Sequence, residues 1–364
     1  MTEREQQILS ILRKEPMIAQ QALADILGLS RSAVAGHIMK LTKKGFIQGK
    51  GYIIAPDKYL VVIGGANMDL CGRSDSSLIS GDSNPGKLTC SAGGVGRNIA
   101  DNLSRLGSSV QFIGALGDDA WGDQLKAACR EAGVNVDHCH TVPGATSSTY
   151  LSIHGPDGEM QLALNDMGLI KKLNAEQLSR REGVIARATA IVLDANLSQD
   201  ALEYIFNNHG EQPILVDPVS SVKAPKLKPF LNSIHTLKPN LMEAELLSGI
   251  TFQSNDDLPR IGEKLHGAGI KRLLISLGSK GAYSSSEDGA AFIPPSATQV
   301  NNVTGAGDAL LAGLAHGHVQ NWPWNRSVEF ALGAARLALI ASDTINSTMS
   351  ENAVKRLLEE SITC

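Results

Sequence analysis

The sequence lacks long apolar runs and lacks cysteines arranged to tie a small domain together. No stretch approaches the roughly 20 apolar residues that a membrane-spanning helix needs, and the opening residues, Thr2 to Glu5, are not those of a secretory signal peptide. The five cysteines are an odd number and include no Cys-x-x-Cys pair, so neither a disulfide framework nor a zinc ribbon is expected. We therefore expect a globular protein of the cytoplasm with no membrane partner.

The common phosphate-binding loops are missing as well. No Gly-x-Gly-x-x-Gly follows an expected strand, and residues 81–87 only approach the P-loop pattern, because Leu88 stands where Ser or Thr would bind Mg²⁺. His138-Cys139-His140 places metal-binding side chains in a row, but adjacent residues of a strand point to opposite faces, so no metal site is predicted there. A nucleotide would have to be bound by another route.

What is present is a chain long enough for two or three domains, with an uneven charge. It has 364 residues, of which 43% are hydrophobic and 19% charged, as in soluble globular proteins. Residues 1–56 carry eight Lys or Arg against four acids, a balance of +4, whereas the whole chain is at −4, which leaves −8 for the remainder. This asymmetry suggests two functions in one polypeptide.

The first 56 residues predict three helices and a short hairpin. The expected elements are a helix around residues 8–12, a helix over 20–27 ending at Gly28, a third helix between its N-cap Ser30 and Gly45, and two strands within 46–54. This order resembles a winged helix-turn-helix DNA-binding domain, in which the third helix enters the major groove. A role in dimerisation or docking is the alternative.

The resemblance implies which side chains of this domain meet duplex DNA. Those at the start of the third helix would face base edges, and later lysines would meet phosphates. These residues are Arg31, Ser32 and Ala35, and Lys40, Lys43, Lys44 and Lys50.

From residue 57 onward, expected strands alternate with expected helices. Strands are expected at 59–63, 110–115, 190–194, 214–217, 234–237 and 272–277, and helices at 96–106, 120–132, 174–188, 200–208, 241–248 and 257–268. Such alternation predicts an α/β fold, doubly wound, with a mostly parallel sheet covered on both faces. Ligands of these folds bind beyond the carboxyl ends of the strands.

Two segments break the alternation, at about 70–91 and about 147–166. Both contain period-two stretches with turn residues, and Pro156-Asp157-Gly158 is a hairpin signal. We expect them to form a small β-flap, or lid, over the ligand edge of the sheet.

Polar residues follow several of the expected strands. Asn67 and Asp69 are two apart, Gly93-Gly94-Val95-Gly96-Arg97-Asn98 opens a helix, and Asn240 and Glu243 share a face if a helix begins there. Asp194, Asn196 and Asp217 come at other strand ends. Each alone is typical of a cap, a turn or a solvated charge, but together they indicate a site.

The segment Asn302-Val-Thr-Gly-Ala-Gly-Asp308 places a turn of small residues before an apolar run. A helix beginning there would present unpaired backbone N–H groups to an anion. Asp308 beside such a turn is either a first-turn cap or a group with a chemical role.

The motifs at 93–98 and 302–308, with Asn240-x-x-Glu243 between them, resemble the signatures of the ribokinase-like, PfkB-type family of sugar and nucleoside kinases. The likeness runs from about residue 57 to the C-terminus. Within that family, the stretches 82–87, 93–100, 165–167, 216–220 and 235–240 resemble the pseudouridine kinases most.

The resemblance implies an ATP-dependent kinase acting on the primary hydroxyl of a nucleoside, with Asp308 as base and Gly305, Ala306 and Gly307 as anion hole. It further implies the following residues: for substrate, Asn67, Asp69, Gly93, Gly94, Asn98, Asn165 and Asp166; for ATP, Asn240, Ser276, Gly278, Gly281, Gly305 and Gly307; and for Mg²⁺, largely through water, Asn240 and Glu243. Asn302 replaces an Asp found in relatives activated by K⁺, which puts a monovalent cation in doubt. A homodimer through the flap is implied too.

Two other functions fit the same residues. The chain could be a transcription regulator that uses the kinase fold to sense a nucleoside or sugar, or a kinase for a free sugar. Retention of Asp308 and Glu243 favours an enzyme, because a sensor needs hydroxyl contacts but no base.

Overall fold

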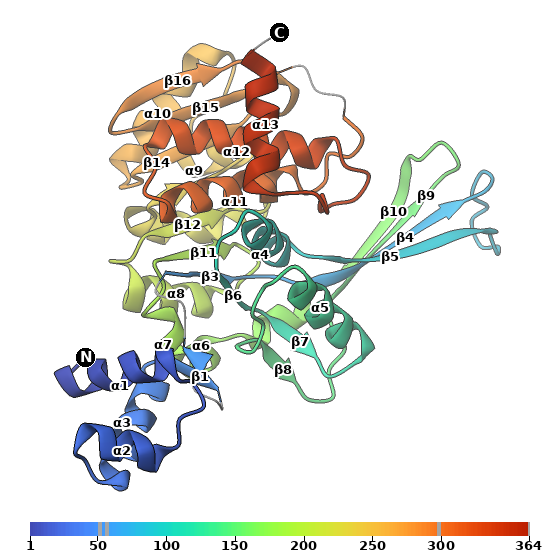
Figure 1. Cartoon of the computed structure of the whole chain (residues 1–364). Coiled ribbons are helices and arrows are strands. Elements are labelled where there is room, and N and C mark those ends of the chain that lie inside the picture. The colour runs from blue at the N-terminus through green and yellow to red at the C-terminus, as the bar shows by residue number, and fades with distance from the viewer. Residues whose placement is uncertain (50–52, 55–57, 297–299, 363–364) are drawn as a thin grey trace. The chain divides into compact units, whose positions relative to one another are not determined.

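The computed structural model describes residues 1–49, 53–54, 58–296 and 300–362, and the chain divides into two compact units (Figure 1). The first unit comprises Met1–Lys58 and, from much later in the chain, Ser179–Ala188. The second comprises Tyr59–Leu178 and Thr189–Cys364. The boundary expected between residues 56 and 57 lies outside the described residues.

The first unit has the helix-turn-helix and hairpin expected from its sequence. Its elements are α1 (Glu3–Lys14), α2 (Gln20–Leu27), α3 (Arg31–Lys43), β1 (Ile47–Gly49) and β2 (Ile53–Ile54). Gly28 ends α2 in the left-handed conformation (φ 64°), and the Ser30 hydroxyl caps α3 by accepting from the Ala33 N–H at 3.1 Å. The apolar stripes of the helices pack into one small core, as the periodicity predicted.

The segment Ser179–Ala188 differs from its prediction. A single helix was expected over 174–188, whereas the structure has α6 (Ala175–Ser179) and α7 (Glu182–Ile185) with a turn between them. Gly183 lies against the backbone of Lys43 and Gly45, so close that a Cβ atom on it would collide with the Lys43 carbonyl. This packing makes α7 part of the first unit, whereas all of α6 except Ser179 belongs to the second.

The second unit is built on an eight-stranded sheet, in the order β16-β15-β14-β13-β12-β11-β3-β6. Its strands are β3 (Leu60–Ile63), β6 (Val110–Ile113), β11 (Ala190–Asp194), β12 (Ile214–Asp217), β13 (Thr236–Leu237), β14 (Arg272–Ser276), β15 (Ala282–Ser286) and β16 (Gly289–Ile293). The strands from β6 to β14 pair in parallel, and β15 and β16 form an antiparallel edge. The mostly parallel sheet is confirmed, and the edge hairpin is an addition to it.

Helices pack on this sheet in two groups (Figure 1). The first comprises α4 (Val95–Arg105), α11 (Ala306–Val319), α12 (Trp324–Leu339) and α13 (Glu351–Ile362), of which α4 and α11 lie directly on the strands. The second comprises α8 (Gln199–His209), α9 (Leu241–Ser248), α10 (Leu258–Gly267) and the 3-10 helix η2 (Ala224–Ser233). None of the helices in the described ranges is long and apolar enough to span a membrane.

The remaining elements are short or belong to the flap. They are α5 (Ala120–Glu131), the parallel pair β7 (Ala115–Gly117) and β8 (His140–Val142), and the 3-10 helices η1 (Gly168–Lys172), η3 (Asn255–Asp257) and η4 (Gly278–Lys280). Within the described part of the chain, no group of three or more His, Cys, Asp or Glu side chains is arranged to hold a metal ion.

The flap is a separate four-stranded sheet that projects from the body of the second unit (Figure 1). It contains β4 (Asn67–Ser74), β5 (Gly86–Gly93), β9 (Thr149–His154) and β10 (Met160–Asp166), in the order β10-β9-β4-β5. Gly158, with φ 87°, lies in the turn between β9 and β10, where the sequence predicted a hairpin. The small β-flap of the predicted fold is confirmed.

Candidate active site

Asp308 lies in the first turn of α11, on a turn that only small residues can form. Gly305 precedes the helix in the left-handed conformation (φ 84°), and a Cβ atom there would collide with the Thr344 carbonyl. The Asp308 side chain is buried, and its carboxylate accepts a hydrogen bond from the Asn98 amide of α4 at 2.8 Å. That bond joins two helices that are 210 residues apart in the sequence, so Asp308 is more than a local cap.

The glycines before Asn98 bring α4 close to the end of β3. A Cβ atom on Gly94 (φ 97°) would lie 2.5 Å from Ala66, and one on Gly96 would lie 2.8 Å from Gly64. A Cβ atom on Gly93 would collide with the Asp69 carboxylate. The glycine motif therefore makes room for the start of α4 and for an acidic side chain beside it.

Asn67 and Asp69 lie together at the base of the flap. The Asn67 amide donates to an Asp69 oxygen at 2.6 Å, as expected for residues two apart on a strand. Register places Asp69 beside Tyr150 of β9, and Tyr150 beside Asn165 of β10, so the three share one face. Asp166, the next residue along, belongs to the opposite face.

Tyr150 was not among the predicted site residues. The sequence did contain a pattern that could have identified it: Tyr150, Ser152 and His154 alternate along an expected flap strand. In the structure all three lie on the face of Asp69.

A buried ion pair lies beside the turn before α11. Lys238, after β13, binds the Asp217 carboxylate at the end of β12 with an N–O distance of 2.7 Å, and both side chains are buried. A Cβ atom on Gly307 would lie 3.0 Å from the Lys238 ammonium, so a fixed positive charge adjoins the turn. The sequence showed Lys238 at a strand end but gave it no role.

Asn240 and Glu243 are bound to each other. They form a capping box at the start of α9: the Asn240 backbone N–H and side-chain amide donate to the two Glu243 oxygens at 2.8 and 2.9 Å, and the Glu243 N–H donates back to Asn240 at 2.9 Å. The predicted shared face is confirmed.

Buried carboxyl groups outnumber cations in this region. Burial raises the pKa of Asp308 to about 7, and the Asp217 carboxylate adds to this rise, while the Asn98 amide and Lys238 oppose it. Burial also raises the pKa of Glu243. Although burial disfavours the charge of Lys238, the Asp217 carboxylate keeps the pKa of this lysine above its ordinary value. Asp308 and Glu243 are therefore protonated more easily than ordinary carboxyl groups.

Asp194, at the end of β11, forms hydrogen bonds with backbone N–H groups. Its carboxylate is fully buried and accepts from the N–H groups of Gly65 and Asn196 at 2.7 and 2.8 Å. These bonds fix the loop after β3, from which Asn67 continues into the flap.

A cavity of about 930 Å³ lies beside the turn before α11, with Ala306 and Gly307 in its lining. Its lining brings together Ser276, Gly278, Gly281, Ala306 and Gly307, five of the residues predicted to form the anion hole or the ATP site. The remaining walls are largely apolar and come from β15, β16 and α12. Asn240 is outside this lining but adjoins it through a bridge to Ser276.

In the first unit, the predicted DNA-contacting residues divide by exposure. Arg31, Ser32, Lys40 and Lys43 are exposed on α3, and Ala35 is half-buried. The Lys44 ammonium binds both oxygens of the buried Glu5 at 2.9 Å. The last predicted residue, Lys50, lies outside the described residues.

A doubly wound sheet with a flap, an acid and a glycine turn at a helix start, and a cavity beside that turn define a class of small-molecule phosphotransferase. The chain belongs to the pfkB family of carbohydrate kinases, whose model matches residues 57–351. A model of winged helix-turn-helix DNA-binding domains matches residues 1–48. The protein is thus a sugar or nucleoside kinase with an N-terminal winged helix-turn-helix.

Two curated relatives come from Escherichia coli strain K12. An uncharacterised sugar kinase, YeiI, is 41% identical over 352 residues, which are 96% of this chain and 97% of the relative. A pseudouridine kinase is 44% identical over 302 residues, which are 83% of this chain and 96% of the relative. The chain is therefore close to a pseudouridine kinase over most of its length.

Solved structures share the fold. A carbohydrate kinase from Agrobacterium tumefaciens is 30% identical, with a TM-score of 0.74, and covers 83% of this chain and 97% of its own. An Arabidopsis thaliana ribokinase, solved with ribose and ATP, has the same TM-score at 23% identity and covers 84% and 99%.

Proposed function

We propose that the protein is an ATP-dependent kinase that phosphorylates the primary hydroxyl of a ribonucleoside, with pseudouridine as the first candidate. The observation that carries the chemistry is the bond between Asp308 and Asn98, which holds a buried carboxylate beside a helix start lined by glycines. The candidate substrate rests on the 44% identity to a pseudouridine kinase.

Asp308 is the proposed base. As the acceptor hydroxyl attacks the γ-phosphate of ATP, its proton moves to the Asp308 carboxylate, and a pKa of about 7 suits both accepting and releasing it. The backbone N–H groups of Gly305, Ala306 and Gly307, with Lys238 beside them, would stabilise the charge on the transferred group. Lys238 is an addition to the residues predicted from the sequence.

The nucleoside would lie between the flap and α4. Asn67, Asp69 and Asn98 are proposed to bind its hydroxyls, with Gly93 and Gly94 beside them, where a Cβ atom would collide with Asp69 or Ala66. Asn165 and Tyr150 would approach from the same flap face as Asp69. Asp166 is on the opposite face, so we no longer propose it as a substrate contact.

ATP is proposed to occupy the 930 Å³ cavity, with Ser276, Gly278 and Gly281 at its border and its phosphates toward Gly305 and Gly307. The carboxyl groups of Asp217, Glu243 and Asp308 all act electrostatically on Lys238, but the described residues include no set of three side chains arranged to hold a metal ion, so Mg²⁺ would be held mainly by water and the ATP phosphates. Asn240 donates to both Glu243 oxygens, and contact of these two residues with Mg²⁺ is proposed to be largely through water, which this ion retains readily. Bound Mg²⁺ would neutralise phosphate charge during transfer.

Replacing the proposed base tests the chemistry. Asp308→Asn should retain ATP binding but lose turnover by about 10²- to 10⁴-fold, the usual contribution of general-base catalysis. Asp123→Asn, which alters an exposed first-turn acid of α5, should keep normal turnover. Near-normal turnover of Asp308→Asn would show that another group accepts the proton.

A substrate screen separates this proposal from its alternatives. ATP consumption is measured with pseudouridine, uridine, other nucleosides, ribose and fructose. Faster turnover of pseudouridine than of the other compounds would support the proposal, and a preference for a free sugar would show that the protein is a sugar kinase instead. Activity on none of them, together with DNA binding that responds to a nucleoside, would favour the sensor.

We do not propose activation by K⁺. The Asn302 amide oxygen accepts from the Thr304 N–H at 2.9 Å, and its NH₂ donates to the Ser342 carbonyl at 3.3 Å. A donor aimed at that carbonyl does not suit a cation. Turnover should be equal in sodium and potassium salts, and a gain specific to potassium would contradict this expectation.

We propose that residues 1–56 bind duplex DNA and that 57–364 form the kinase domain, apart from Ser179–Ala188, which belong to the first unit. The exposed Arg31, Ser32, Lys40 and Lys43 support binding by α3, whereas Lys44 is committed to Glu5. Full-length protein should bind mixed duplex fragments more weakly as salt rises. Arg31→Ala should weaken binding, and Lys264→Ala in α10 should not. No association even at low salt would reject a DNA-binding role.

We also propose a homodimer formed through the flap. Leu88, Leu162 and Leu164 share its second face and are 64% to 66% exposed. An exposed apolar face of this kind is typical of a protein interface.

A further inference from the structure

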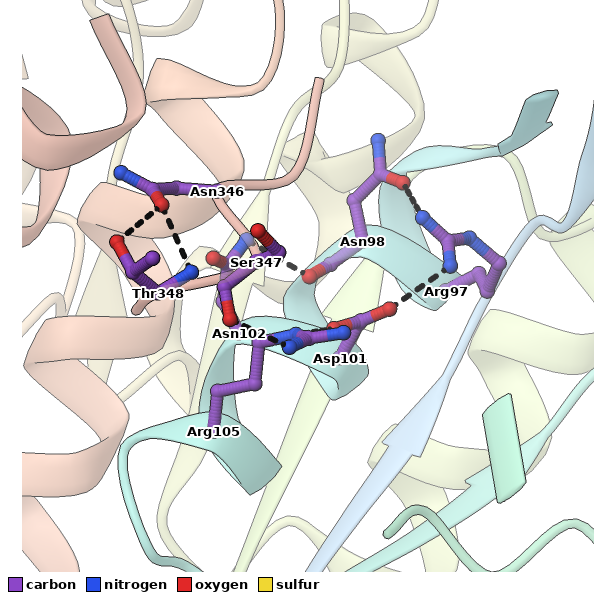
Figure 2. Close-up of polar contacts among 8 residues, drawn as sticks. All are labelled: Arg97, Asn98, Asp101, Asn102, Arg105, Asn346, Ser347 and Thr348. Atoms are coloured by element: carbon purple, nitrogen blue, oxygen red, sulfur yellow. Dashed lines mark hydrogen bonds and ion pairs between the residues drawn. The ribbon is translucent and has the colours of Figure 1, made fainter. Parts of the chain in front are cut away.

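Three charged residues form a ladder along α4, spaced four residues apart (Figure 2). Arg97 donates to one Asp101 oxygen at 3.0 Å, and Arg105 donates to the other at 2.5 Å. The Arg97 and Asp101 side chains are only 3% and 5% exposed. Buried ion pairs are often no more stabilising than apolar packing, so stability alone does not account for this ladder.

The first residue of the ladder holds the amide of Asn98. An Arg97 nitrogen donates to the Asn98 oxygen at 2.6 Å, and the Asn98 NH₂ donates to Asp308 at 2.8 Å (Figure 2 shows the first of these bonds). A guanidinium can only donate, so only the oxygen of the amide can face it. Arg97 thereby directs the NH₂ toward Asp308.

The last residue of the ladder holds the segment behind the anion-hole turn. Arg105 donates to the Ser347 carbonyl at 3.0 Å (Figure 2). Three residues earlier, the Thr344 carbonyl lies against Gly305 so closely that no side chain fits there. The ladder therefore ends on a segment that packs against the turn before Asp308.

We propose that Arg97 is a positioning residue, which fixes the Asn98 amide so that the Asp308 carboxylate points at the acceptor hydroxyl, and that Asp101 and Arg105 hold Arg97 in place. This inference rests on the proposed role of Asp308 as base. Arg97 does not touch the reacting atoms. Its charge also acts on Asp69, where it opposes the pKa rise that burial causes.

Freeing the amide has a defined electrostatic consequence. The NH₂ of Asn98 favours the charged form of Asp308, whereas a rotated amide would present its oxygen to the carboxylate and raise the pKa of Asp308. The other charged groups that act on Asp308 are Asp194, Asp217 and Lys238, at the ends of β11, β12 and β13. None of them changes in the variants below.

The test compares Arg97→Met with Arg97→Lys in the full-length kinase. Arg97→Met should lower kcat by about 10- to 100-fold, as misplaced catalytic groups do, with little change in KM for ATP. The acid limb of its kcat/KM profile should move to higher pH. Arg97→Lys keeps a hydrogen-bond donor, so its kcat and the pH of its acid limb should both lie closer to those of the wild type.

A double-mutant cycle separates positioning from a general structural role. In an Asn98→Ala background, Arg97→Met should cause little further loss of kcat, because the amide through which Arg97 acts is gone. Equal losses in both backgrounds would overturn the proposal, as would an unchanged kcat and acid limb in Arg97→Met. If Arg97→Met does not fold, the same cycle with Arg97→Lys decides.

These outcomes are distinct from failure of the proposed function. If Asp308→Asn is inactive and the Arg97 variants are normal, the base stands and the positioning role is wrong. If Asp308→Asn turns over normally, the proposed base itself is wrong.

Discussion

At the scale of single residues, the surroundings of Asp308 affect the stability of the protein as well as the proposed chemistry. Burial of this carboxylate and the nearby Asp217 raise its pKa to about 7, although Asn98 and Lys238 act in the opposite direction. An unfolded Asp has a pKa near 3.9. The folded protein therefore binds this proton more tightly than the unfolded chain does.

The sign of the stability effect follows from that difference. Below about pH 4 both states are protonated, and as pH rises from about 4 to about 7 the unfolded state alone releases the proton, so the free energy of unfolding falls. Asp308→Asn removes the penalty, and its advantage in Tm over the wild type should grow between pH 5 and pH 8. Thermal unfolding across this range measures it. Asp123→Asn should show no such trend, and a gap for Asp308→Asn that is constant with pH would contradict the raised pKa.

Residue types and spacing indicated which side chains gather at the site, but not how they pair. Asn240 and Glu243 were expected on one face, and their capping box shows how they use it. The role of Lys238 could not be predicted from the sequence, because its position beside Gly307 depends on how β13 and α11 are arranged in the fold. Alternation along a strand already implied that Asn165 and Asp166 face opposite sides, but the register was needed to show that Asn165 is the one on the face of Asp69.

At the scale of elements, the flap is a sheet with two unlike faces. Asp69, Ser91, Tyr150 and Asn165 form a polar row across it. The neighbouring row, through Leu70, Cys90, Leu151 and Leu164, belongs to the apolar face. The sheet proposed to bind a nucleoside on its polar face thus has an exposed apolar face on the other side.

Charges on the apolar face should disrupt the proposed homodimer. Leu162→Glu with Leu164→Glu places two carboxylates on that face, where pairing of two flaps would bury them. We expect a monomer by light scattering, with the wild type a dimer. Ala163→Glu is the matched control, because Ala163 is also exposed on β10 but points to the other face. A dimer that survives the double change would locate the interface elsewhere, and a monomeric wild type would exclude it.

Apolar runs located most of the central strands, but an apolar signature was neither always recognised nor always present: α12 was missed although it buries many apolar residues. The buried parallel strands are rich in Val, Ile and Leu, and the sequence located them to within a few residues. In contrast, β15 is buried although three of its five residues are serine, so its composition gave no strand signal. Helix α7 was misassigned to a longer helix because periodicity cannot show which part of the fold a segment packs on.

At the scale of the whole molecule, the first unit is assembled from two distant parts of the sequence. The turn from α3 to β1 contains Gly45 (φ 74°) and Phe46, and the segment Ser179–Ala188 packs on it. The Arg187 guanidinium lies 3.5 Å from the centre of the Phe46 ring and donates to the Gly45 carbonyl at 2.5 Å. A Cβ atom on Gly45 would lie 2.5 Å from the Gly183 carbonyl. The composition and charge of residues 1–56 marked a separate domain, but nothing in them indicated that a later segment completes it.

Removing Arg187 should therefore loosen the winged helix-turn-helix unit without affecting catalysis. The lost interactions include a cation–π contact, worth about 0.5–2 kcal/mol, and a charged hydrogen bond, worth about 1.5–3 kcal/mol, and they are not additive. In full-length Arg187→Ala we expect faster hydrogen exchange of α3 amides and weaker DNA binding, with kcat unchanged. Lys172→Ala, which removes an exposed charge outside the segment, is the control. Unaltered exchange in α3 would show that the unit does not depend on this segment. A fall in kcat equal to the loss of DNA binding would show instead that Arg187 supports the whole chain.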